Sequence, residues 1–449
     1  MVNKVLIANR GEIASRIIRT CKKLGIQTVA IYSEADQNAP YVKEADESFL
    51  IGPPRVDESY LRVDKILSVA KESGADAIHP GYGFLSENNI FAESCKKEGL
   101  IFIGPSSKVI KSMGNKIEAR KIMKETGIPV VPGTADAVSS IEEAVNIAEQ
   151  IGYPIMLKAS AGGGGIGMQV VNSNEELTKA FEGNSKRALL FFGDGSMFLE
   201  KKIKNARHIE VQLLADDYGN VVHLFERDCS IQRRNQKVIE EAPSIFISEE
   251  TRTAMGNAAV KAAKAIGYTN AGTIEFLVDN EENFYFLEMN TRIQVEHPVT
   301  EEITGIDIVE EQFRIASGEK LSFVQDDLRI NGHAVEARIY AEDPVKFFPS
   351  PGHISNLVLP EGEQIRHELS VTSNCDVTPF YDPMIGKLIV KGSTRQEAIT
   401  VLREALLEYQ IEGIKTNIPM LLKISENEEF IKGNTTTAFV NEHFLVEIK

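Results

Sequence analysis

Residues 288–301 read EMNTRIQVEHPVTE, and polar side chains fall on every second position of the first nine residues. The polar positions of one parity are Glu288, Asn290, Arg292, Gln294 and Glu296. Successive side chains of an extended strand point to opposite faces, so this spacing predicts two carboxylates, two amides and a guanidinium along one face. The alternative is a solvated strand face that carries mixed charges.

The stretch before it, GTIEFLVDNEENFYFLEMN, reads as two apolar strands around a polar turn. If residues 280–283 form a four-residue loop, Val278 faces Tyr285 and Glu275 lies directly opposite Glu288. Opposed side chains have Cβ atoms about 4.5–5.5 Å apart, and two carboxylates that close repel unless a cation lies between them. The hairpin therefore predicts a cation site.

The ligand atoms indicate which cation this site would hold. The carboxylates of Glu275 and Glu288, with the amide of Asn290 nearby, suit Mg²⁺ or Mn²⁺. A magnesium ion that leaves positions open for phosphate oxygens usually serves nucleotide chemistry. On the same predicted face, Arg292 and Glu296 have the character of an anion clamp and a general base.

A basic cluster lies upstream in the stretch ERDCSIQRRNQKVIEEAP. Within eleven residues of an otherwise acidic chain it gathers Arg227, Arg233, Arg234 and Lys237. We interpret the cluster as a site for a small anionic substrate. The alternative is a helix face that pairs with Glu240 and Glu241.

A glycine-rich loop lies in the stretch YPIMLKASAGGGGIGMQVV, between predicted strands at residues 155–159 and 168–171. Its glycines match G-x-G-x-x-G, but a strand follows where a dinucleotide-binding turn needs a helix, and the P-loop pattern is missing. The backbone N–H groups of such a loop suit phosphate oxygens, with Lys158 as a counter-charge. The alternative is a mobile surface loop.

The first hundred residues predict an open α/β domain. The run KVLIA (residues 4–8), a helical pattern closed by Gly25 and the run TVAIY form a βαβ unit, which implies a parallel sheet. Two further strand patterns, ADAIH and LIFIG, extend it to a boundary near residue 114. The first turn has only Gly11 where a dinucleotide fingerprint needs three glycines, which argues against nicotinamide or flavin binding.

Composition narrows the class of protein. The 449 residues fit two to four domains, and a net charge of −16 argues against a general nucleic-acid binder. No apolar run approaches a membrane span, and the N-terminus lacks the features of a signal peptide. Four scattered cysteines without a CxxC pair fit reduced thiols. We therefore expect a cytoplasmic α/β protein that binds neither nucleic acid nor membranes.

The motifs together resemble the biotin carboxylase subunit or domain of the biotin-dependent carboxylases, which have the ATP-grasp fold. The resemblance is carried by HPGYGFLSEN (residues 79–88), KASAGGGGIGM, RHIEVQ, ERDCSIQRR, GTIEF and EMNTRIQVEHPVTE. It extends to nearly the full chain through GHAVEARIYAEDP (residues 332–344), FFPSPG, YDPMIGKLIV and EGIKTN. The last two motifs are typical of the carboxylase C-terminal domain and not of ATP-grasp ligases in general.

This resemblance implies an α/β fold with four parts. A Rossmann-like N-terminal domain would occupy residues 1–114, and an ATP-grasp linker with the glycine-loop lid would occupy residues 115–203. The central ATP-grasp domain would span residues 204–330. A C-terminal α+β domain would span residues 331–449.

The resemblance also implies the site residues. Contacts to ATP would come from Lys116, Lys158, Gly163, Gly164, Gly165, Glu200, Lys201, Lys202, Ile203, His208, Gln232, Asn235, Glu275, Leu277 and Glu288. Two Mg²⁺ (or Mn²⁺) ions would be held by Glu275, Glu288 and Asn290. Bicarbonate would contact Lys237, Arg292, Gln294 and the backbone of Val295, and biotin would contact Tyr82, Gly83 and Arg338.

The implied reaction has two stages. Glu296 would deprotonate bicarbonate, which attacks the γ-phosphate of ATP and gives carboxyphosphate and ADP. Carboxyphosphate would break down to CO₂ and phosphate, the phosphate would take the N1′ proton of biotin, and Arg338 would stabilise the enolate. The catalytic residues would thus be Lys237, Arg292, Glu296 and Arg338, acting by positioning and charge neutralisation.

The expected partners are a biotin carboxyl carrier protein, a second copy of the chain in a homodimer, and a carboxyltransferase subunit. A separate carrier is expected because the string nearest to a biotin-attachment turn, IMKE at residues 122–125, lies in a helical pattern. The acyl acceptor stays open between acetyl-CoA or another acyl-CoA and pyruvate.

The sequence departs from the family pattern in three places. Ile166 stands in the lid where a basic residue is common, so we expect weaker ATP binding and not an inactive enzyme. Asn235 replaces a frequent His and puts one nucleotide contact in doubt. Residues 366–380 lack the usual Gly-Tyr pair near the expected biotin entrance.

Two other functions are compatible with parts of the pattern. A different ATP-grasp ligase that forms an acyl phosphate for amine attack would share the metal row but would not need Arg338 or the HPGYGF loop. A non-catalytic nucleotide-binding regulator would need neither Glu296 nor Arg338. Release of phosphate from ATP that depends on bicarbonate and biotin separates these functions from a biotin carboxylase.

Overall fold

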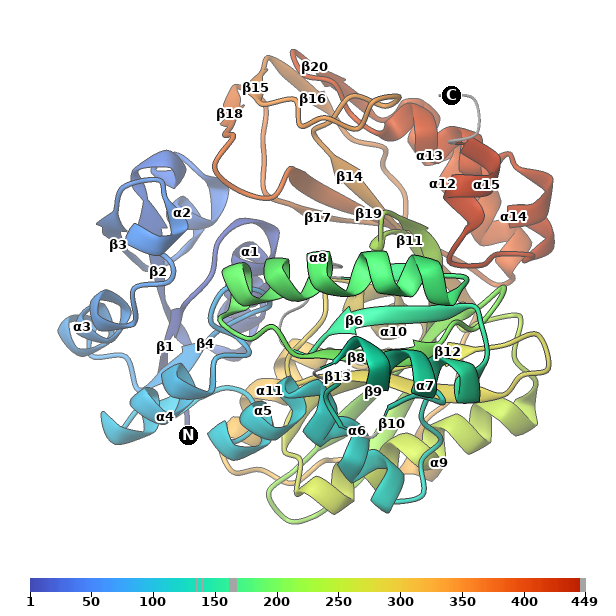
Figure 1. Ribbon diagram of the computed structural model, residues 1–449. Helices are drawn as coiled ribbons and strands as arrows, with labels where there is room; N and C mark the ends of the chain where they lie inside the picture. The colour runs from blue at the N-terminus through green and yellow to red at the C-terminus, as the bar shows by residue number, and fades with distance from the viewer. Residues whose placement is uncertain (135, 139, 161–167, 445–449) are drawn as a thin grey trace.

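The computed structural model describes residues 1–134, 136–138, 140–160 and 168–444, and Figure 1 shows how its parts are arranged. The N-terminal part is a five-stranded parallel sheet in the order β3-β2-β1-β4-β5. Its strands are β1 Lys4–Ile7, β2 Gln27–Ser33, β3 Glu47–Gly52, β4 Ala77–His79 and β5 Ile101–Phe102. Its helices are α1 Gly11–Leu24, α2 Pro40–Glu44, α3 Val63–Ser73, α4 Asn89–Lys97 and α5 Ser107–Gly114. The predicted βαβ unit and parallel sheet are confirmed.

Helix α1 illustrates how the sequence builds this part. Its residues Ile13, Ile17 and Cys21 recur at helical spacing and are buried. Gly25 ends the helix with φ of 72°, and its N–H donates to the carbonyls of Cys21 and Lys22. Glycine adopts this left-handed conformation without the penalty that a Cβ atom brings, so the chain turns directly into β2.

The next part carries the glycine-rich segment. Its elements are α6 Lys116–Glu125, α7 Ile141–Ile151, β6 Ile155–Ala159, β7 Gln169–Val171, α8 Asn174–Phe192 and β8 Met197–Lys201. The strands pair antiparallel in the order β7-β6-β8, and Figure 1 shows this sheet with α7 and α8 in front of the larger sheet. The predicted strands on either side of the glycine loop are confirmed. Gly163, Gly164, Gly165 and Ile166 lie outside the described residues.

The largest sheet has eight strands in the order β13-β12-β9-β10-β11-β14-β19-β17. They are β9 Arg207–Ala215, β10 Val221–Arg233, β11 Gln236–Ala242, β12 Asn270–Val278, β13 Phe284–Asn290, β14 His333–Tyr340, β17 Ile365–Leu369 and β19 Met384–Gly392. The nearby helices are α9 Glu249–Ile266, α10 His297–Thr304 and α11 Ile308–Ala316. Because β11 pairs with β14, one sheet crosses the expected boundary at residue 331.

The C-terminal part continues from this sheet. Its short strands are β15 Gly352–Ile354, β16 Asn356–Val358, β18 Cys375–Val377 and β20 Gln410–Glu412. Its helices are α12 Arg395–Glu408, α13 Ile418–Ser425, α14 Glu428–Lys432 and α15 Phe439–Phe444. Short 3₁₀ turns in the chain are η1 Glu34–Asp36, η2 Val56–Glu58 and η3 Gln325–Asp327.

The predicted hairpin forms, with one correction to its register. Glu275 does pair with Glu288, but Val278 lies opposite Phe284 and not Tyr285. The loop spans residues 279–283, which is one residue longer than expected, and a bulge at Leu287 restores the register of the two glutamates. A bulge places two residues against one and is found next to functional sites.

Two other sequence interpretations change. Strand β13 ends at Asn290, and residues 291–296 turn toward α10, so only Glu288 and Asn290 of the five alternating polar residues lie on a strand. Pro298 in the first turn of α10 favours this helix start. The basic cluster lies on β10, β11 and their turn, which rules out the helix-face alternative.

All four cysteines are free thiols. In the described part of the chain, no helix has the length and apolar character needed to cross a membrane.

Candidate active site

A row of charges runs across four neighbouring strands of the large sheet. Arg227 on β10 lies opposite Glu210 on β9, Glu210 lies opposite Glu275 on β12, and Glu275 lies opposite Glu288 on β13. Three carboxylates on adjacent strands repel each other at this spacing. The row therefore needs cations, and only its first member is one.

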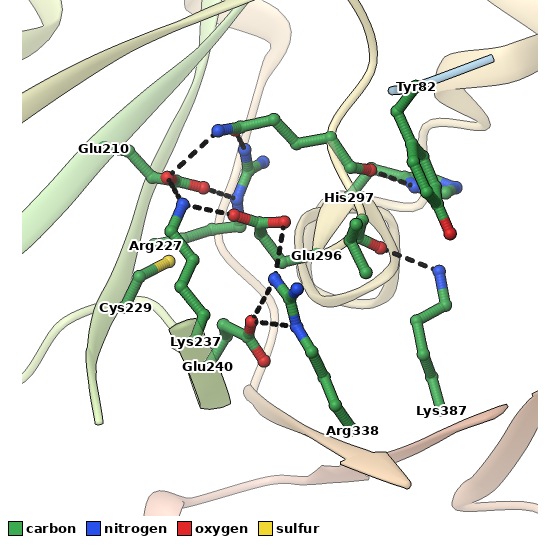
Figure 2. Close-up of polar contacts among 12 residues, drawn as sticks. Tyr82, Glu210, Arg227, Cys229, Lys237, Glu240, Glu296, His297, Arg338 and Lys387 are labelled. Atoms are coloured by element: carbon green, nitrogen blue, oxygen red, sulfur yellow. Dashed lines mark hydrogen bonds and ion pairs between the residues drawn. The ribbon is translucent and has the colours of Figure 1, made fainter. Parts of the chain in front are cut away.

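Lys237 on β11 supplies one of these cations. Its Nζ atom donates to Glu210 Oε2 at 2.6 Å, to Glu275 Oε1 at 3.0 Å and to a carboxylate oxygen of Glu296. Burial disfavours the charged form, but Cys229 and the three carboxylates raise the pKa of Lys237 well above its usual value. Figure 2 shows this lysine between Glu210 and Glu296.

Arg227 is fully buried and fixes the floor of the site. Its Nε atom donates to Glu210 Oε1 at 2.6 Å, and its terminal nitrogens donate to Gln212 Oε1 at 2.8 Å and Gln294 Oε1 at 2.6 Å. The guanidinium of Arg227 is therefore paired inside the protein and is not available to a bound anion. The prediction that the whole basic cluster binds an anion is therefore wrong for Arg227.

The other members of the basic cluster also divide. Arg233 is buried against Glu342, with one N–O distance of 2.8 Å, and Arg234 is exposed in the turn between β10 and β11. Within the cluster, Arg227 and Lys237 both contact the carboxylate row, and Lys237 also contacts Glu275 and Glu296. These basic residues are neighbours in the sequence. Carboxylates elsewhere in the chain determine which of them remain available to bind an anion.

Glu296 stands at the start of α10 between two cations. One carboxylate oxygen accepts from Lys237, and Oε2 accepts from Arg338 at 3.0 Å. Burial would raise the pKa of Glu296, but Lys237, Arg338 and Arg227 together lower it well below its usual value. The group is an ionised carboxylate, which is the form that a general base requires.

Arg338 on β14 connects this base to the C-terminal part. Its Nε donates to Glu240 Oε1 at 2.6 Å, and a terminal nitrogen lies 2.5 Å from the same oxygen. The second link, to Glu296, is visible in Figure 2. These contacts leave the guanidinium fixed at the edge of the cavity that Tyr82 and Gly83 also line.

Arg292 and Gln294 follow the end of β13 and turn toward the same place. Arg292 donates from Nε to Glu87 Oε2 at 2.9 Å and from a terminal nitrogen to Asn290 Oδ1 at 2.9 Å. Gln294 Nε2 donates to Glu275 Oε1 at 2.7 Å. Four of the polar positions from the quoted stretch therefore meet at one site, although a turn and not a strand brings them there.

The residues expected to hold metal ions fit divalent cations by their donor atoms. Glu275 Oε1 accepts from Asn290 Nδ2 at 2.8 Å, and Glu275 Oε2 lies 2.9 Å from His208 Nε2. Among the described residues Glu288 forms no ion pair, and burial and the charge of Glu275 raise its pKa. Glu288 is half-buried and faces Glu275 without a cation of its own in the described part of the chain, and a metal ion would neutralise such a pair.

The expected phosphate-binding lysines lie near one another on the opposite part. Lys158 on β6 is buried and forms an ion pair with Glu200, which also pairs with Arg120. Burial lowers the pKa of Lys116, against the attraction of Glu288, and neighbouring Lys158 lowers it further. Two lysines that close repel each other unless anions separate them, so the pair suits phosphate groups.

The remaining residues that were expected to contact ATP differ in exposure and in the partners that they contact. Gln232 Nε2 lies 2.9 Å from His208 Nδ1, Leu277 is paired with His208 across the strands, and Asn235 is exposed with a φ of 66°. The Lys201 ammonium donates to the carbonyl of Gly152 at 2.7 Å and so points away from the carboxylate row. Lys202 is exposed and Ile203 is half-buried.

A cavity of about 470 Å³ opens beside Arg338. Its lining includes Tyr82, Gly83, Arg292, Val295 and Arg338, with further aromatic residues at Phe84, Tyr340, Phe380 and Tyr381. The loop that carries Tyr82 and Gly83 is held by Asn9, whose Nδ2 donates to the carbonyls of Pro80 and Tyr82 at 2.8 and 2.7 Å. The predicted biotin residues thus share this cavity with two of the four predicted bicarbonate residues, Arg292 and Val295.

Several polar residues of the site were missed from the sequence. They are Glu12, Glu87, Glu210, Glu240 and Lys387. His208, Glu210 and Gln212 alternate along the sequence, which indicates a polar strand face but not its use. Glu87 and Lys387 stand inside two of the quoted motifs, where neither spacing nor residue type distinguishes them from surface charges.

The site combines opposed carboxylates on an antiparallel sheet, a neighbouring pair of lysines and a separate small sheet beside the glycine loop. This combination is typical of nucleotide-dependent ligases of the ATP-grasp class. Comparison with protein families makes the assignment specific. Residues 1–110 match "Biotin carboxylase, N-terminal domain" and residues 336–442 match "Biotin carboxylase C-terminal domain". Residues 115–324 match "Carbamoyl-phosphate synthase L chain, ATP binding domain". The chain belongs to the biotin carboxylase family.

Individual relatives agree with this assignment. Biotin carboxylase 2 of Bacillus subtilis is 64% identical over 99% of this chain and 100% of its own length. A pyruvate carboxylase subunit of Methanothermobacter thermautotrophicus is 55% identical over 99% of this chain and 90% of its own. The predicted family and the prediction of a ligase that carboxylates biotin with ATP are confirmed.

Solved structures agree as well. The biotin carboxylase domain dimer of 2-oxoglutarate carboxylase from Hydrogenobacter thermophilus, in complex with MgADP, ADP and bicarbonate, is 52% identical with a TM-score of 0.96. The alignment covers 99% of this chain and 98% of that one. A biotin carboxylase complex with β-γ-ATP from Campylobacter jejuni is 48% identical with a TM-score of 0.97, over 99% of both chains. The predicted ATP-grasp fold is confirmed.

Proposed function

We propose that this chain uses ATP, Mg²⁺ and bicarbonate to carboxylate biotin carried on a separate carrier protein, through carboxyphosphate. The observation that carries the proposal is the placement of ionised Glu296 between Lys237 and Arg338, at the junction of the carboxylate row and the cavity. A base at this junction can serve a substrate that touches both regions. Bicarbonate is such a substrate, because it is small, anionic and carries a proton that a carboxylate can remove.

Bicarbonate would bind to Lys237, Arg292, Gln294 and the backbone of Val295. An anion that draws the ammonium of Lys237 away from Glu296 removes part of the attraction that lowers the pKa of that carboxyl. Glu296 then becomes a stronger base and takes the bicarbonate proton. The freed oxygen attacks the γ-phosphorus, the bond to ADP breaks, and carboxyphosphate forms.

ATP and metal ions would occupy the space between the large sheet and the glycine-loop part. Glu275, Glu288 and Asn290 would hold two Mg²⁺ ions, which supply charge neutralisation for the phosphate oxygens when bound. Lys116 and Lys158 would contact the phosphates, and Glu200, Lys201, Lys202, Ile203, His208, Gln232, Asn235 and Leu277 would surround the nucleoside. The MgADP and bicarbonate of the Hydrogenobacter complex support this assignment.

Biotin would enter the cavity lined by Tyr82, Gly83 and Arg338. Carboxyphosphate would release CO₂ and phosphate there, and the phosphate would take the N1′ proton of biotin. Arg338 is suited to the resulting enolate because its guanidinium carries a fixed positive charge at the cavity wall. The new C–N bond then forms between biotin and CO₂.

The relatives support the expected partners. Several are subunits of pyruvate and 2-oxoglutarate carboxylases, and one is a dimer of the biotin carboxylase domain, which supports a homodimer working with a carrier and a carboxyltransferase subunit. Because the names of these relatives differ in the acceptor, the acceptor of this chain stays open between an acyl-CoA, pyruvate and another compound. The domain boundaries at residues 114, 203 and 330 and the cytoplasmic location remain predictions.

The test is carboxylation of free biotin by the purified chain. Phosphate release from MgATP should require bicarbonate and increase with biotin, and label from radioactive bicarbonate should appear on biotin. The proposal would be contradicted if the rate of phosphate release did not depend on bicarbonate, or if biotin did not become labelled. Removing Mg²⁺ with EDTA should abolish both signals.

A further inference from the structure

A buried lysine outside the described catalytic set reaches the same turn as Arg338. Lys387 lies on β19, its side chain is fully buried, and its Nζ atom donates to the carbonyl oxygen of Val295 at 2.7 Å. Burying an ammonium group costs free energy unless it is paired and hydrogen-bonded. The question is therefore what this contact holds in place.

The position of Lys387 in the sheet makes the arrangement costly. Lys387 lies directly opposite Arg338 on β14, so two cations occupy neighbouring positions on adjacent strands. Like charges at directly opposed positions destabilise a sheet. Figure 2 shows both side chains extending toward the turn before α10, where Arg338 contacts the carboxylate of Glu296 and Lys387 contacts the preceding carbonyl.

A carboxylate from the N-terminal part compensates Lys387. Glu12, in the first turn of α1, has its Oε1 atom 3.2 Å from Lys387 Nζ and is 3% exposed. The same Oε1 atom accepts a hydrogen bond from the hydroxyl of Tyr82. Contacts thus run without interruption from Tyr82 at the cavity, through Glu12 and Lys387, to Val295.

The geometry points to Lys387 as a positioning residue for Glu296, which rests on the proposed function. The carbonyl of Val295 and the N–H of Glu296 belong to one planar peptide unit, so fixing that carbonyl fixes the direction in which the Glu296 backbone leaves the turn.

The contacts also assign a role to Glu12 and Tyr82. Glu12 holds the ammonium of Lys387 in line with the carbonyl of Val295, and Tyr82 orients Glu12. A loop that lines the cavity and a turn that carries the base are therefore positioned by one set of contacts, although they come from residues 82 and 295–296 of the chain. Bicarbonate, which we place against the Val295 backbone, should depend on this set, whereas ATP should not.

The variant Lys387→Met removes the ammonium and keeps most of the side-chain volume. We expect the KM for bicarbonate to rise and kcat for bicarbonate-dependent ATP cleavage to fall, each roughly tenfold, with the KM for ATP unchanged. A merely structural lysine would lower the amount of folded enzyme and leave both KM values alone. Unchanged bicarbonate kinetics, or equal changes in the two KM values, would overturn the inference.

A matched control stands four residues further along the same strand. Lys391 donates to the carbonyl of Glu302 at 2.6 Å, which is the same kind of contact at the far end of α10. Lys391→Met should leave the KM for bicarbonate unchanged. A rise in that KM equal to the rise in Lys387→Met would overturn the inference, because any lysine on this strand would then have the effect.

Loss of Lys387 leaves Glu12 buried without its cation, and the single variant can fail to fold. The double variant Glu12→Gln with Lys387→Met removes both charges, and Glu12→Gln alone keeps the shape of the side chain. The double variant should show the raised KM for bicarbonate, and Glu12→Gln alone should show a smaller rise. If a variant folds and has the same kinetic constants for bicarbonate as the wild type, the inference is overturned. If the wild-type enzyme itself shows no bicarbonate-dependent ATP cleavage, the proposed function is overturned instead.

Discussion

Glu240 on β11 and Glu336 on β14 lie directly opposite each other in the large sheet, and both side chains are fully buried. Glu240 accepts from Arg338 through Oε1, while its Oε2 and both oxygens of Glu336 have no hydrogen-bond partner among the described residues. Burial raises the pKa of Glu240 to about 7 and that of Glu336 well above its usual value. Burial therefore favours the neutral form of Glu336, which lies beside Arg338.

Because burial favours the neutral form of Glu336, we expect Glu336→Gln to fold and stay active. A carboxyl group whose folded pKa is raised above its unfolded value gives stability at low pH that is lost as the pH rises through the folded pKa. The wild-type free energy of unfolding should thus fall as the pH rises above the usual pKa of a glutamate, and Glu336→Gln should reduce this fall. Urea unfolding at several pH values measures it, and a variant with the wild-type slope would contradict the assignment.

Glu296→Gln should reduce bicarbonate-dependent ATP cleavage by about 10²–10⁴-fold, because the amide keeps the shape of the side chain but accepts no proton. Arg338→Gln should instead impair transfer to biotin more than ATP cleavage. Both rates are measured in the same assay with and without biotin. The control is Glu250→Gln, an exposed position on α9. Equal losses of both activities in the two variants would show that the roles are not divided as proposed.

Glu288→Gln should separate the stability of the protein from its response to metal. Without metal, the variant should unfold at a higher temperature than the wild type, because it removes repulsion between Glu288 and Glu275. Stabilisation by MgATP should decrease, because a metal ligand is lost. Thermal unfolding with and without MgATP measures both effects. An unchanged gain from MgATP would remove Glu288 from the proposed metal site.

The ion pair between Glu241 and Arg395 should stabilise the fold at neutral pH. Burial would raise the pKa of Glu241, but His333 and Arg395 lower it to about 2. A lowered folded pKa gives stability above the unfolded pKa that is lost as the pH falls toward the folded pKa. Arg395→Met should cost about 3–5 kcal/mol at about pH 7 and less at about pH 3, whereas Arg403→Met, at an exposed site on the same helix, should cost little. Equal costs at the two pH values would contradict this prediction.

Local pattern was enough to predict the pairing of Glu275 with Glu288, since two short strands around a polar turn have few possible registers. The bulge at Leu287 was not predictable, because an extra residue in one strand leaves the apolar pattern almost unchanged. The partners of Glu275 on the other side, Glu210 and Lys237, depend on strand pairings between distant segments.

The basic cluster also shows that contacts between distant segments cannot be predicted from local sequence. Four cations close together in sequence suggested one anion site, but Glu210 and Glu342 neutralise Arg227 and Arg233 inside the fold. Lys387 and Glu12 were missed for a related reason. Each is an ordinary charge in an ordinary element, and their meeting requires α1 and β19 to be brought together from opposite ends of the chain.

The pairing of β11 with β14 limits how this enzyme can be divided. A fragment that ends at residue 330 would expose β11 as an unpaired sheet edge, and such edges recruit strands from other molecules. The same cut would remove the partners of Glu240 and Glu241, which are Arg338, His333 and Arg395. Neither piece should be soluble alone, so gene fusions or split versions of this enzyme should be joined in the surface loops and not at this boundary.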